Sequence, residues 1–420
     1  MKQEIKDRIE KIRKGEVPKG YRDSEIGIVP TDWRVVSFGS LGTWKKGKGI
    51  PNDDIKANGL PAIRYGDIYM KYNTFFKQSD FMIDEETAKS STAIKKGDLI
   101  FTGSGESAEE IGKCVVYLGD ETAYIGGDII ALTPSNGDSL FLSYQQNAYL
   151  QIKQKAKLGQ GYSVVHIYSN FLKSIAIPFP EKIEQKKIAE ILFAWDDGIA
   201  IREKLIYSMR MSKKGYVQRL VNPIPGKKSK YLELSKCLIP TSYPVDKPTK
   251  PYDALGIRSH CKGTMVKPVS DPSKVDMDTL YEVKENELIV NITFAWEGAI
   301  ALLSKKDEGK LVSHRFPTFR FNEASAIPDY FKHLIKTKWF VFQLGLVSPG
   351  GAGRNRVLSK KDFLKIKLML PPVEKQRKIA NFLNSLDQEI DLLERELKEL
   401  KQQKKGLMQL LLTGIVRVKA

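Results

Sequence analysis

The sequence has few cysteines and no long hydrophobic run. Its three cysteines, Cys114, Cys237 and Cys261, lie far apart, and none belongs to a CxxC pair. This spacing argues against a disulfide framework or a zinc ribbon and is typical of a reducing compartment. No apolar segment approaches the roughly 20 residues that span a bilayer, and the N-terminus lacks the apolar region of a secretory signal. We therefore expect a cytoplasmic protein without a membrane partner.

Recognisable catalytic motifs are also missing. Residues 42–49 (GTWKKGKG) resemble a phosphate-binding loop, but Gly49 stands where Ser or Thr should hold magnesium, so we interpret them as a basic loop. Residues 103–105 (GSG) lack the outer glycines of a nucleophile elbow. The histidines show no HExxH spacing and are expected to be ordinary polar residues: His166, His260, His314 and His333. The sequence thus predicts no catalytic residue and no metal site.

One catalytic alternative stays open in the second half of the chain. Glu282 and Lys284, with Asp278 upstream, can be aligned with a metal-nuclease pattern. Glu-x-Lys triplets such as residues 282–284 are common by chance in a chain rich in Lys and Glu. An autonomous metal-dependent nuclease is therefore a minor hypothesis.

Positive charge, in contrast, is abundant. The 420 residues include 68 Lys and Arg against 50 Asp and Glu, which gives a formal net charge of +18 at pH 7. Such an excess favours a polyanionic partner, and DNA or RNA is the usual one.

A long helical segment occurs twice, 191 residues apart. Residues 184–221 align without a gap against residues 375–412, and thirteen of the 38 positions are identical. Shorter matches surround the repeat, such as 97–100 (GDLI) with 286–289 (NELI). A repeat of this length predicts two similar halves.

Both helical copies show a heptad pattern, with apolar residues spaced alternately by four and three. The predicted seam is Ile188, Leu192, Ile199, Ile206 and Met209 in the first copy, and Ile379, Leu383, Leu386, Ile390, Leu393, Leu397 and Leu400 in the second. About 38 helical residues span roughly 57 Å at ~1.5 Å each. An exposed stripe of that length must pair, and the simplest partner is the other copy, antiparallel if the halves are related by a pseudo-twofold axis. An external helix or a homodimer is the alternative.

The segments around these helices have mixed patterns. Short strand-like pieces at 61–65, 98–101, 113–117 and 128–132 alternate with helical stretches. We expect an N-terminal helical segment (1–20), a first mixed domain (21–180), a first helix (181–222), a second mixed domain (223–372), a second helix (373–414) and a C-terminal tail (415–420). The predicted fold class is α+β, with two α/β domains joined by two long helices in an antiparallel coiled coil.

Loops that mix basic, aromatic and glycine residues are the candidates for DNA contact. Arg pairs with guanine and Asn or Gln with adenine in the major groove, while Lys neutralises phosphates. The candidates are Lys45, Lys46 and Lys48; Gln160, Tyr162 and Ser163; His314 and Arg315; and Arg354, Asn355 and Arg356.

Taken together, these segments resemble the specificity subunit of a type I restriction–modification system. The similar segments are 24–33 (SEIGIVPTDW), 177–189 (IPFPEKIEQKKIA), 295–300 (AWEGAI), 370–380 (LPPVEKQRKIA) and 405–414 (KGLMQLLLTG). The resemblance covers nearly the whole chain. Lys375 departs from the pattern, because an acidic residue usually precedes Gln376.

The resemblance implies a DNA reader without an active site of its own. Two target recognition domains would each read one half of a bipartite, asymmetric site, and the paired helices would set the gap. Two methyltransferase subunits would dock on the helices and use S-adenosylmethionine, and restriction (translocase) subunits using ATP and magnesium would join for cleavage. This chain would bind no cofactor itself. A specificity subunit of a type II-like enzyme and a coiled-coil adaptor that never touches DNA are the alternatives.

Overall fold

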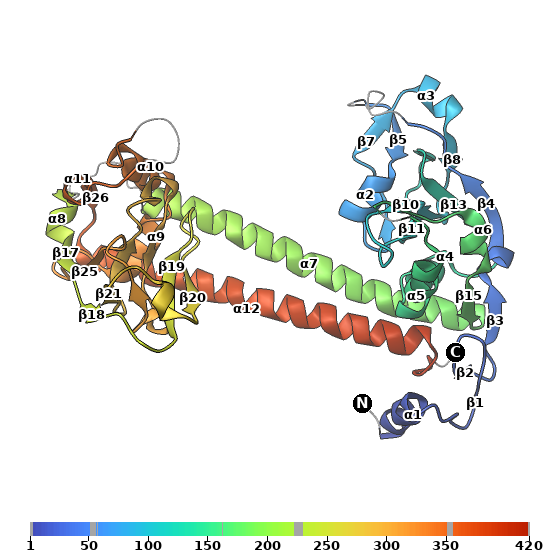
Figure 1. Cartoon of the computed structure of the whole chain (residues 1–420). Helices are drawn as coiled ribbons and strands as arrows, with labels where there is room; N and C mark the ends of the chain where they lie inside the picture. Colours follow the sequence, from blue (N-terminus) through green and yellow to red (C-terminus); the bar gives the residue numbers. More distant parts are fainter. Residues whose placement is uncertain are drawn as a thin grey trace. The chain divides into compact units, whose positions relative to one another are not determined.

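The chain forms two compact units in a computed structural model. The structure describes residues 3–50, 56, 58–161, 163–221, 230–350 and 356–418, apart from the side chain of Lys230. Unit 1 comprises Met1–Ile201 with Leu397–Ala420, and unit 2 comprises Arg202–Glu396. Each unit contains one mixed domain and part of each long helix (Figure 1). Among the described residues, no helix combines the length and the hydropathy that crossing a membrane requires.

Unit 1 is built on two sheets. The larger contains, in spatial order, β4 (Gly42–Lys46), β13 (Ile129–Pro134), β9 (Leu99–Thr102), β11 (Cys114–Tyr117) and β6 (Phe75–Phe76). The smaller contains β7 (Phe81–Ile83), β5 (Leu60–Ile63), β12 (Ala123–Ile125) and β8 (Thr92–Ile94). Three two-stranded pairs are β1 (Tyr21–Arg22) with β2 (Val29–Pro30), β3 (Arg34–Ser37) with β15 (Ala176–Phe179), and β10 (Ser104–Gly105) with β14 (Val165–His166). The helices are α1 (Gln3–Arg13), η1 (Phe38–Leu41), α2 (Tyr65–Met70), α3 (Glu85–Ser90), α4 (Ser139–Gln146), α5 (Tyr149–Leu158) and α6 (Ser169–Ser174).

The central strand β9 is buried on both faces. Leu99 and Phe101 share a hydrophobic cluster with Phe141 of α4, whereas Ile100 shares another with Ile125 of the smaller sheet. Successive side chains of a strand point to opposite faces, so β9 contributes to two cores. A strand covered on both sides needs apolar residues throughout, which explains the unbroken run of Leu, Ile and Phe in its sequence.

Unit 2 repeats this plan. One sheet contains β17 (Leu238–Thr241), β25 (Thr318–Phe321), β22 (Leu288–Val290) and β23 (Ile300–Leu302), and the other contains β18 (Pro244–Asp246), β21 (Thr279–Glu282), β24 (Leu311–Val312), β19 (Tyr252–Ile257) and β20 (Thr264–Val269). β16 (Lys230–Glu233) pairs with β26 (Lys367–Leu370). The helices are α8 (Leu234–Cys237), η3 (Pro272–Lys274), η4 (Ala295–Glu297), η5 (Lys305–Asp307), α9 (Pro328–Leu334), α10 (Lys338–Leu346) and α11 (Lys360–Leu364). In β22, Leu288 and Ile289 again belong to different clusters.

The predicted fold class is confirmed, with one local correction. The strand-like pieces lie in β5, β9, β11 and β13, and the matched segments 97–100 and 286–289 lead into the equivalent strands β9 and β22. Residues 42–46, however, are not a loop but the edge strand β4, paired along β13. Trp44 explains the difference, because its ring stacks on Phe101 at 5.8 Å and fixes the segment against the core.

Two long helices belong partly to each unit. They are α7 (Lys182–Leu220) and α12 (Val373–Leu412), and all twelve predicted seam residues are buried or half-buried. In unit 2 three ion pairs join the helices: Arg202–Glu396, Arg210–Glu394 and Lys213–Asp387. Residue numbers rise along α7 as they fall along α12, so the helices are antiparallel. In unit 1 Asp196 pairs with Lys404 at 2.5 Å. In the repeat alignment Asp196 corresponds to Asp387 and Lys404 corresponds to Lys213, so this pair is equivalent to Lys213–Asp387.

Each helix is attached to its own mixed domain by a buried glutamine. Gln185 accepts a hydrogen bond from the backbone N–H of Asp138 (2.8 Å) and donates to the carbonyl of the proline five residues earlier (2.8 Å). Gln376 accepts from the N–H of Ile327 (3.1 Å) and donates to the proline at the same offset (2.9 Å). Both side chains are fully buried. The junction between domain and helix is therefore the same in the two halves.

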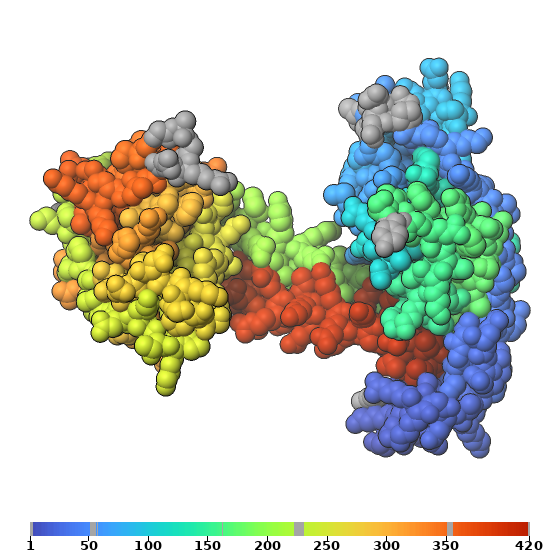
Figure 2. Space-filling view, viewed as in Figure 1, coloured from blue at the N-terminus to red at the C-terminus, as the bar shows by residue number. Residues whose placement is uncertain are grey.

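The first and last parts of the chain meet in unit 1. Glu184 accepts hydrogen bonds from Trp33 Nε1 (3.0 Å) and from Arg417 (2.8 Å), and Arg417 also pairs with Asp32 (2.7 Å). Figure 2 shows the N-terminal residues packed against the C-terminal ones in this unit. The second helix has Lys375 at the position of Glu184, so this carboxylate cluster belongs to unit 1 alone.

Candidate nucleic-acid interface

The first predicted lysine cluster lies in a groove of unit 1. The exposed Lys45 and Lys46 line the groove together with Lys173 and His166, and its volume is about 410 Å³. Among the described residues these lysines form no ion pair; the ammonium of Lys173 lies 6.0 Å from the centre of the Trp44 ring. Unpaired ammonium groups along an open groove can neutralise phosphates.

A histidine at this groove connects it to the second predicted loop. His166 Nδ1 lies 2.9 Å from the Ser104 hydroxyl, and the two residues face each other in the β10–β14 pair. Gln160 forms an isolated bridge with His166 and is exposed. From the sequence His166 is expected to be an ordinary polar residue. Its place in the groove depends on strand pairing that no local motif indicates.

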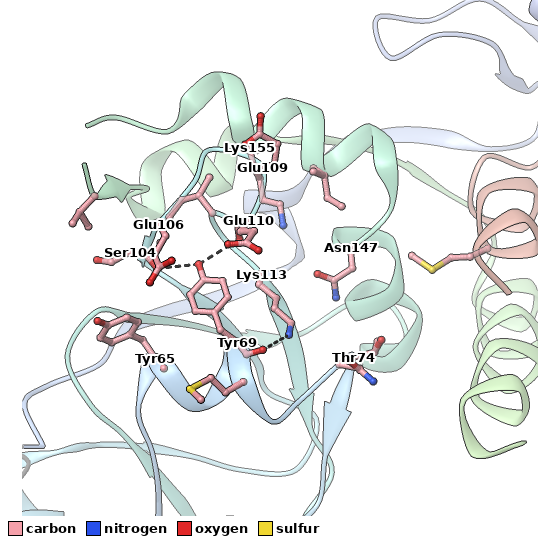
Figure 3. Close-up of a pocket in the computed structure, with 18 of the residues that line it drawn as sticks. Tyr65, Tyr69, Thr74, Ser104, Glu106, Glu109, Glu110, Lys113, Asn147 and Lys155 are labelled. Atoms are coloured by element: carbon pink, nitrogen blue, oxygen red, sulfur yellow. Dashed lines mark hydrogen bonds between the residues drawn. The ribbon is translucent and has the colours of Figure 1, made fainter. Parts of the chain in front are cut away.

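A larger pocket of unit 1, of about 850 Å³, adjoins Ser104 (Figure 3). The Tyr69 hydroxyl lies 2.9 Å from the Ser104 carbonyl oxygen and 2.7 Å from the Thr102 hydroxyl, and burial raises the pKa of Tyr69. Tyr69 therefore stays protonated and holds the start of the 104–110 loop. The exposed side chains at this pocket include three carboxylates: Glu106, Glu109 and Glu110. Carboxylates repel phosphate, and the lysine groove has one exposed carboxylate, Asp128, beside its three lysines, so it suits a DNA backbone better than this pocket does.

Unit 2 has a groove at the equivalent place. Both grooves lie beside an edge strand and a short helix, β4 and α6 in unit 1 and β17 and α11 in unit 2. In unit 2 the predicted His314 lines the groove, of about 300 Å³, with Ser242, Lys360 and Lys361. The two halves thus present different side chains on the same scaffold.

The remaining described candidates of unit 2 lie around the segment that links β22 to β23. The Arg356 guanidinium lies over the Trp296 ring, 5.4 Å from its centre. Backbone hydrogen bonds from Leu358 to Ile292 (2.8 Å) and from Ile292 to Arg315 (3.0 Å) bring the loops of Arg356 and Arg315 together. Arg315 is exposed and Arg356 half-buried. Planar, permanently charged guanidinium groups on such a surface suit phosphate or guanine recognition.

The other predicted contacts are only partly described. Lys48 and Ser163 are exposed, next to β4 and β14 respectively. Tyr162, Arg354 and Asn355 lie outside the described residues.

In the described part of the chain, the residues of the nuclease pattern do not gather into a metal site. Lys284 donates to the carboxylate of Glu282 at 2.6 Å, and Asp278 is fully exposed beside Lys247. Within the part of the chain that the structure describes, no group of three or more His, Cys, Asp or Glu side chains could hold a metal ion.

Comparisons with known proteins agree with the fold and the repeat. A family model described as "Type I restriction modification DNA specificity domain" matches residues 30–208 and 268–402. A putative type I restriction enzyme MjaX specificity subunit of Methanocaldococcus jannaschii is 27% identical, over 96% of this chain and 97% of the relative. The MjaVIII specificity subunit of the same organism is 24% identical, over 93% and 94%.

Two solved structures share the fold. One is a type I restriction–modification S subunit from M. genitalium, with a TM-score of 0.55 and 17% identity over 90% of this chain and 96% of that chain. The other comes from work on complex assembly and conformational transition of the type I system, with a TM-score of 0.56 and 13% identity over 92% and 99%.

Proposed function

Because the chain belongs to the family of type I restriction modification DNA specificity domains, we propose that it is the DNA-reading subunit of such a complex. Each mixed domain reads one half of a bipartite, asymmetric site, and the antiparallel helices set the gap between the halves. The chain itself performs no catalysis. It acts in the cytoplasm, where its DNA target is found.

One observation supports this proposal above the others. The junction of each domain with its helix is repeated, in Gln185 and Gln376, whereas the exposed side chains of the two equivalent grooves differ. A constant frame with two different surfaces is what a reader of two unlike half-sites needs. Each surface has exposed basic groups to offer to DNA.

The long helices offer a surface for partner subunits. Several of their apolar side chains are exposed: Ile183 and Ile201 in unit 1, and Tyr207, Met211 and Leu392 in unit 2. These exposed apolar side chains lie outside the seam and are available for contact with a partner protein. We assign them to two methyltransferase subunits, which bind S-adenosylmethionine. Restriction subunits, which bind ATP and magnesium, complete the complex for cleavage.

Domain exchange tests the assignment of half-sites. Residues 227–370 are replaced by the corresponding domain of a relative, and methylated sites are mapped genome-wide in cells that contain the cognate methyltransferase. We expect a gapped motif in which only one half changes. Exchange of residues 21–180 is the matched control and should change only the other half. Methylation that is unaffected by either exchange contradicts the proposal.

Insertion into a long helix tests the ruler. Four helix-forming residues lengthen a helix by ~6 Å and should widen the gap while both half-sites stay the same. Four residues inserted at the exposed turn of Gly309, outside the helices, provide the control and should leave the gap unchanged. A changed half-site with an unchanged gap is the opposite result.

A further inference from the structure

The tip of the β19–β20 hairpin has an unusual backbone. Residues 258–263 (RSHCKG) connect the two strands, and His260 and Cys261 have φ angles of 61° and 54°. Side chains with a Cβ rarely adopt this left-handed conformation, and glycine adopts it freely. Two consecutive non-glycine residues there persist only where the surrounding structure holds them, and such strain is concentrated at functional sites.

The tip is held by hydrogen bonds to the segment that leads into β23. The N–H groups of His260 and Cys261 donate to the carbonyls of Glu297 (2.7 Å) and Gly298 (2.9 Å). The Ser259 hydroxyl donates to the Glu297 carboxylate (2.7 Å). Gly298 itself has a φ of 78°, and a Cβ there would come within 3.2 Å of Cys261 Sγ. The tip is therefore fixed in position before any ligand arrives.

The fixed tip presents three side chains to solvent. Arg258, His260 and Lys262 are exposed, whereas Cys261 is half-buried and its thiol donates to the carbonyl of Ile335 (3.2 Å). Among the described residues, neither a hydrogen bond nor an ion pair engages the three exposed side chains. Arg258 and Lys262 carry unpaired positive charges on either side of His260. In a DNA groove a base edge lies between phosphates, so the two cations suit the phosphates and the histidine suits the base edge.

The tip also adjoins the other candidates of unit 2. Glu297, which accepts from His260, follows Trp296 directly, and Trp296 lies beneath the Arg356 guanidinium. The tip, the 291–298 segment and the loop of Arg356 are thus connected neighbours.

We propose that the 258–263 tip is a base-reading element of unit 2, in which the His260 imidazole contacts a base edge in the major groove. Arg258 and Lys262 hold the flanking phosphates. The inference rests on the proposed function and adds to it a specificity-determining residue. Glycine at position 260 would remove the backbone strain, so the presence of histidine there is explained by its side chain.

The test exploits this strain. In His260→Gly the backbone relaxes and the imidazole is lost, so a folding defect does not obscure the result. Asn286→Gly is the matched control, because Asn286 is also exposed, belongs to unit 2 and has a φ of 62°. Each variant is assembled with the cognate methyltransferase subunits and given a plasmid library with randomised sequence, and the methylated motif and the thermal midpoint are measured.

For His260→Gly we expect a gapped motif with the first half-site intact. Discrimination at one base pair of the second half-site should fall by about ten- to a hundredfold, the usual range for one lost base contact, while the thermal midpoint does not decrease. Asn286→Gly should keep the complete motif. Arg258→Ala and Lys262→Ala should weaken binding to all sequences and each reduce the salt slope by about one.

The outcomes distinguish an error in the assignment of the 258–263 tip from an error in the proposed DNA-reading function. If the wild-type complex yields the gapped motif and His260→Gly leaves its second half unchanged, the assignment of the tip is wrong and the DNA reader stands. A change in the first half-site, or the same change in Asn286→Gly, also refutes the assignment. If the wild-type complex yields no gapped motif, the proposed function fails and the assignment falls with it.

Discussion

Removing one partner of the ion pair between Asp196 and Lys404 should cost more stability than removing one partner of an exposed pair between the long helices, such as Arg210–Glu394. The carboxylate and the ammonium are 2.5 Å apart, and their side chains are only 11% and 15% exposed. The Tyr144 hydroxyl also donates to Asp196 (2.6 Å), and burial is the main cause that raises the pKa of Tyr144. Removing the carboxylate leaves both a nearly buried ammonium and a buried hydroxyl without an acceptor.

For Asp196→Ala we expect a loss of about 3 kcal/mol in the free energy of unfolding. Breaking a buried pair by removing one partner costs about 3–5 kcal/mol, and the remaining exposure places this pair at the lower end. The control is Glu394→Ala, because Glu394 and its partner Arg210 are 37% and 62% exposed. Exposed pairs contribute about 0.2–1 kcal/mol. In the double variant Asp196→Leu with Lys404→Met, much of the loss should be recovered, since apolar replacement of both charges is close to neutral.

Native-state hydrogen exchange is the suitable assay, because two units need not unfold in one step. Core amides of unit 1, such as those of β9, report the loss for Asp196→Ala, and core amides of unit 2, such as those of β22, report the loss for Glu394→Ala. Equal losses for Asp196→Ala and Glu394→Ala, or no recovery in the double variant, would refute the reasoning from burial.

Three further predictions concern unit 2. Burial lowers the pKa of His333 from 6.5 to about 4, so the unfolded chain takes up a proton first as the pH falls. Stability that is complete above pH 6.5 should therefore decline toward pH 4, by at most about 1.4 kcal/mol per pH unit, and urea unfolding of His333→Gln should lack this part of the slope. Gln376→Leu leaves the N–H of Ile327 without its acceptor and should lower the free energy of unfolding by about 1–3 kcal/mol, measured by hydrogen exchange of α9. Arg356→Ala should weaken DNA binding by the assembled complex and lower the salt slope by about one if the guanidinium contacts phosphate, as anisotropy titrations at several salt concentrations would show.

The fold could be predicted from the sequence where apolar residues repeat in a regular pattern over a long stretch. The heptad spacing of residues such as Leu383 and Ile390 indicates a helix whose stripe must be covered, and their burial follows from that requirement. The apolar runs of β9 and β22 indicate strands covered on both faces, and the match of their sequences indicates equivalent positions. Strand β4 was missed because its five residues are rich in lysine. It forms because Trp44 packs on Phe101, a contact between distant parts of the chain.

The candidate interface was less accessible to sequence reasoning. Lys45 was predicted from a local signal, a cluster of basic residues beside Trp44 and glycines. His166 and His260 were not, because their surroundings depend on pairing with Ser104 and Glu297, far away in the chain. The left-handed backbone at His260 is fixed by such tertiary hydrogen bonds, and no neighbouring residue indicates it.

The meeting of Glu184 with Arg417 has a consequence for the order in which the protein is made. Unit 2 is one continuous stretch, whereas unit 1 needs Leu397–Ala420, which follow it in the chain. Leu411 and Leu412 are part of the same core as Trp33. At about 5–20 residues per second, the ribosome takes roughly 10–40 s to synthesise unit 2. During that time the first domain lacks the part of its core that Leu411 and Leu412 supply. A chain that stops before Leu397 would thus contain every residue of unit 2 and an open unit 1.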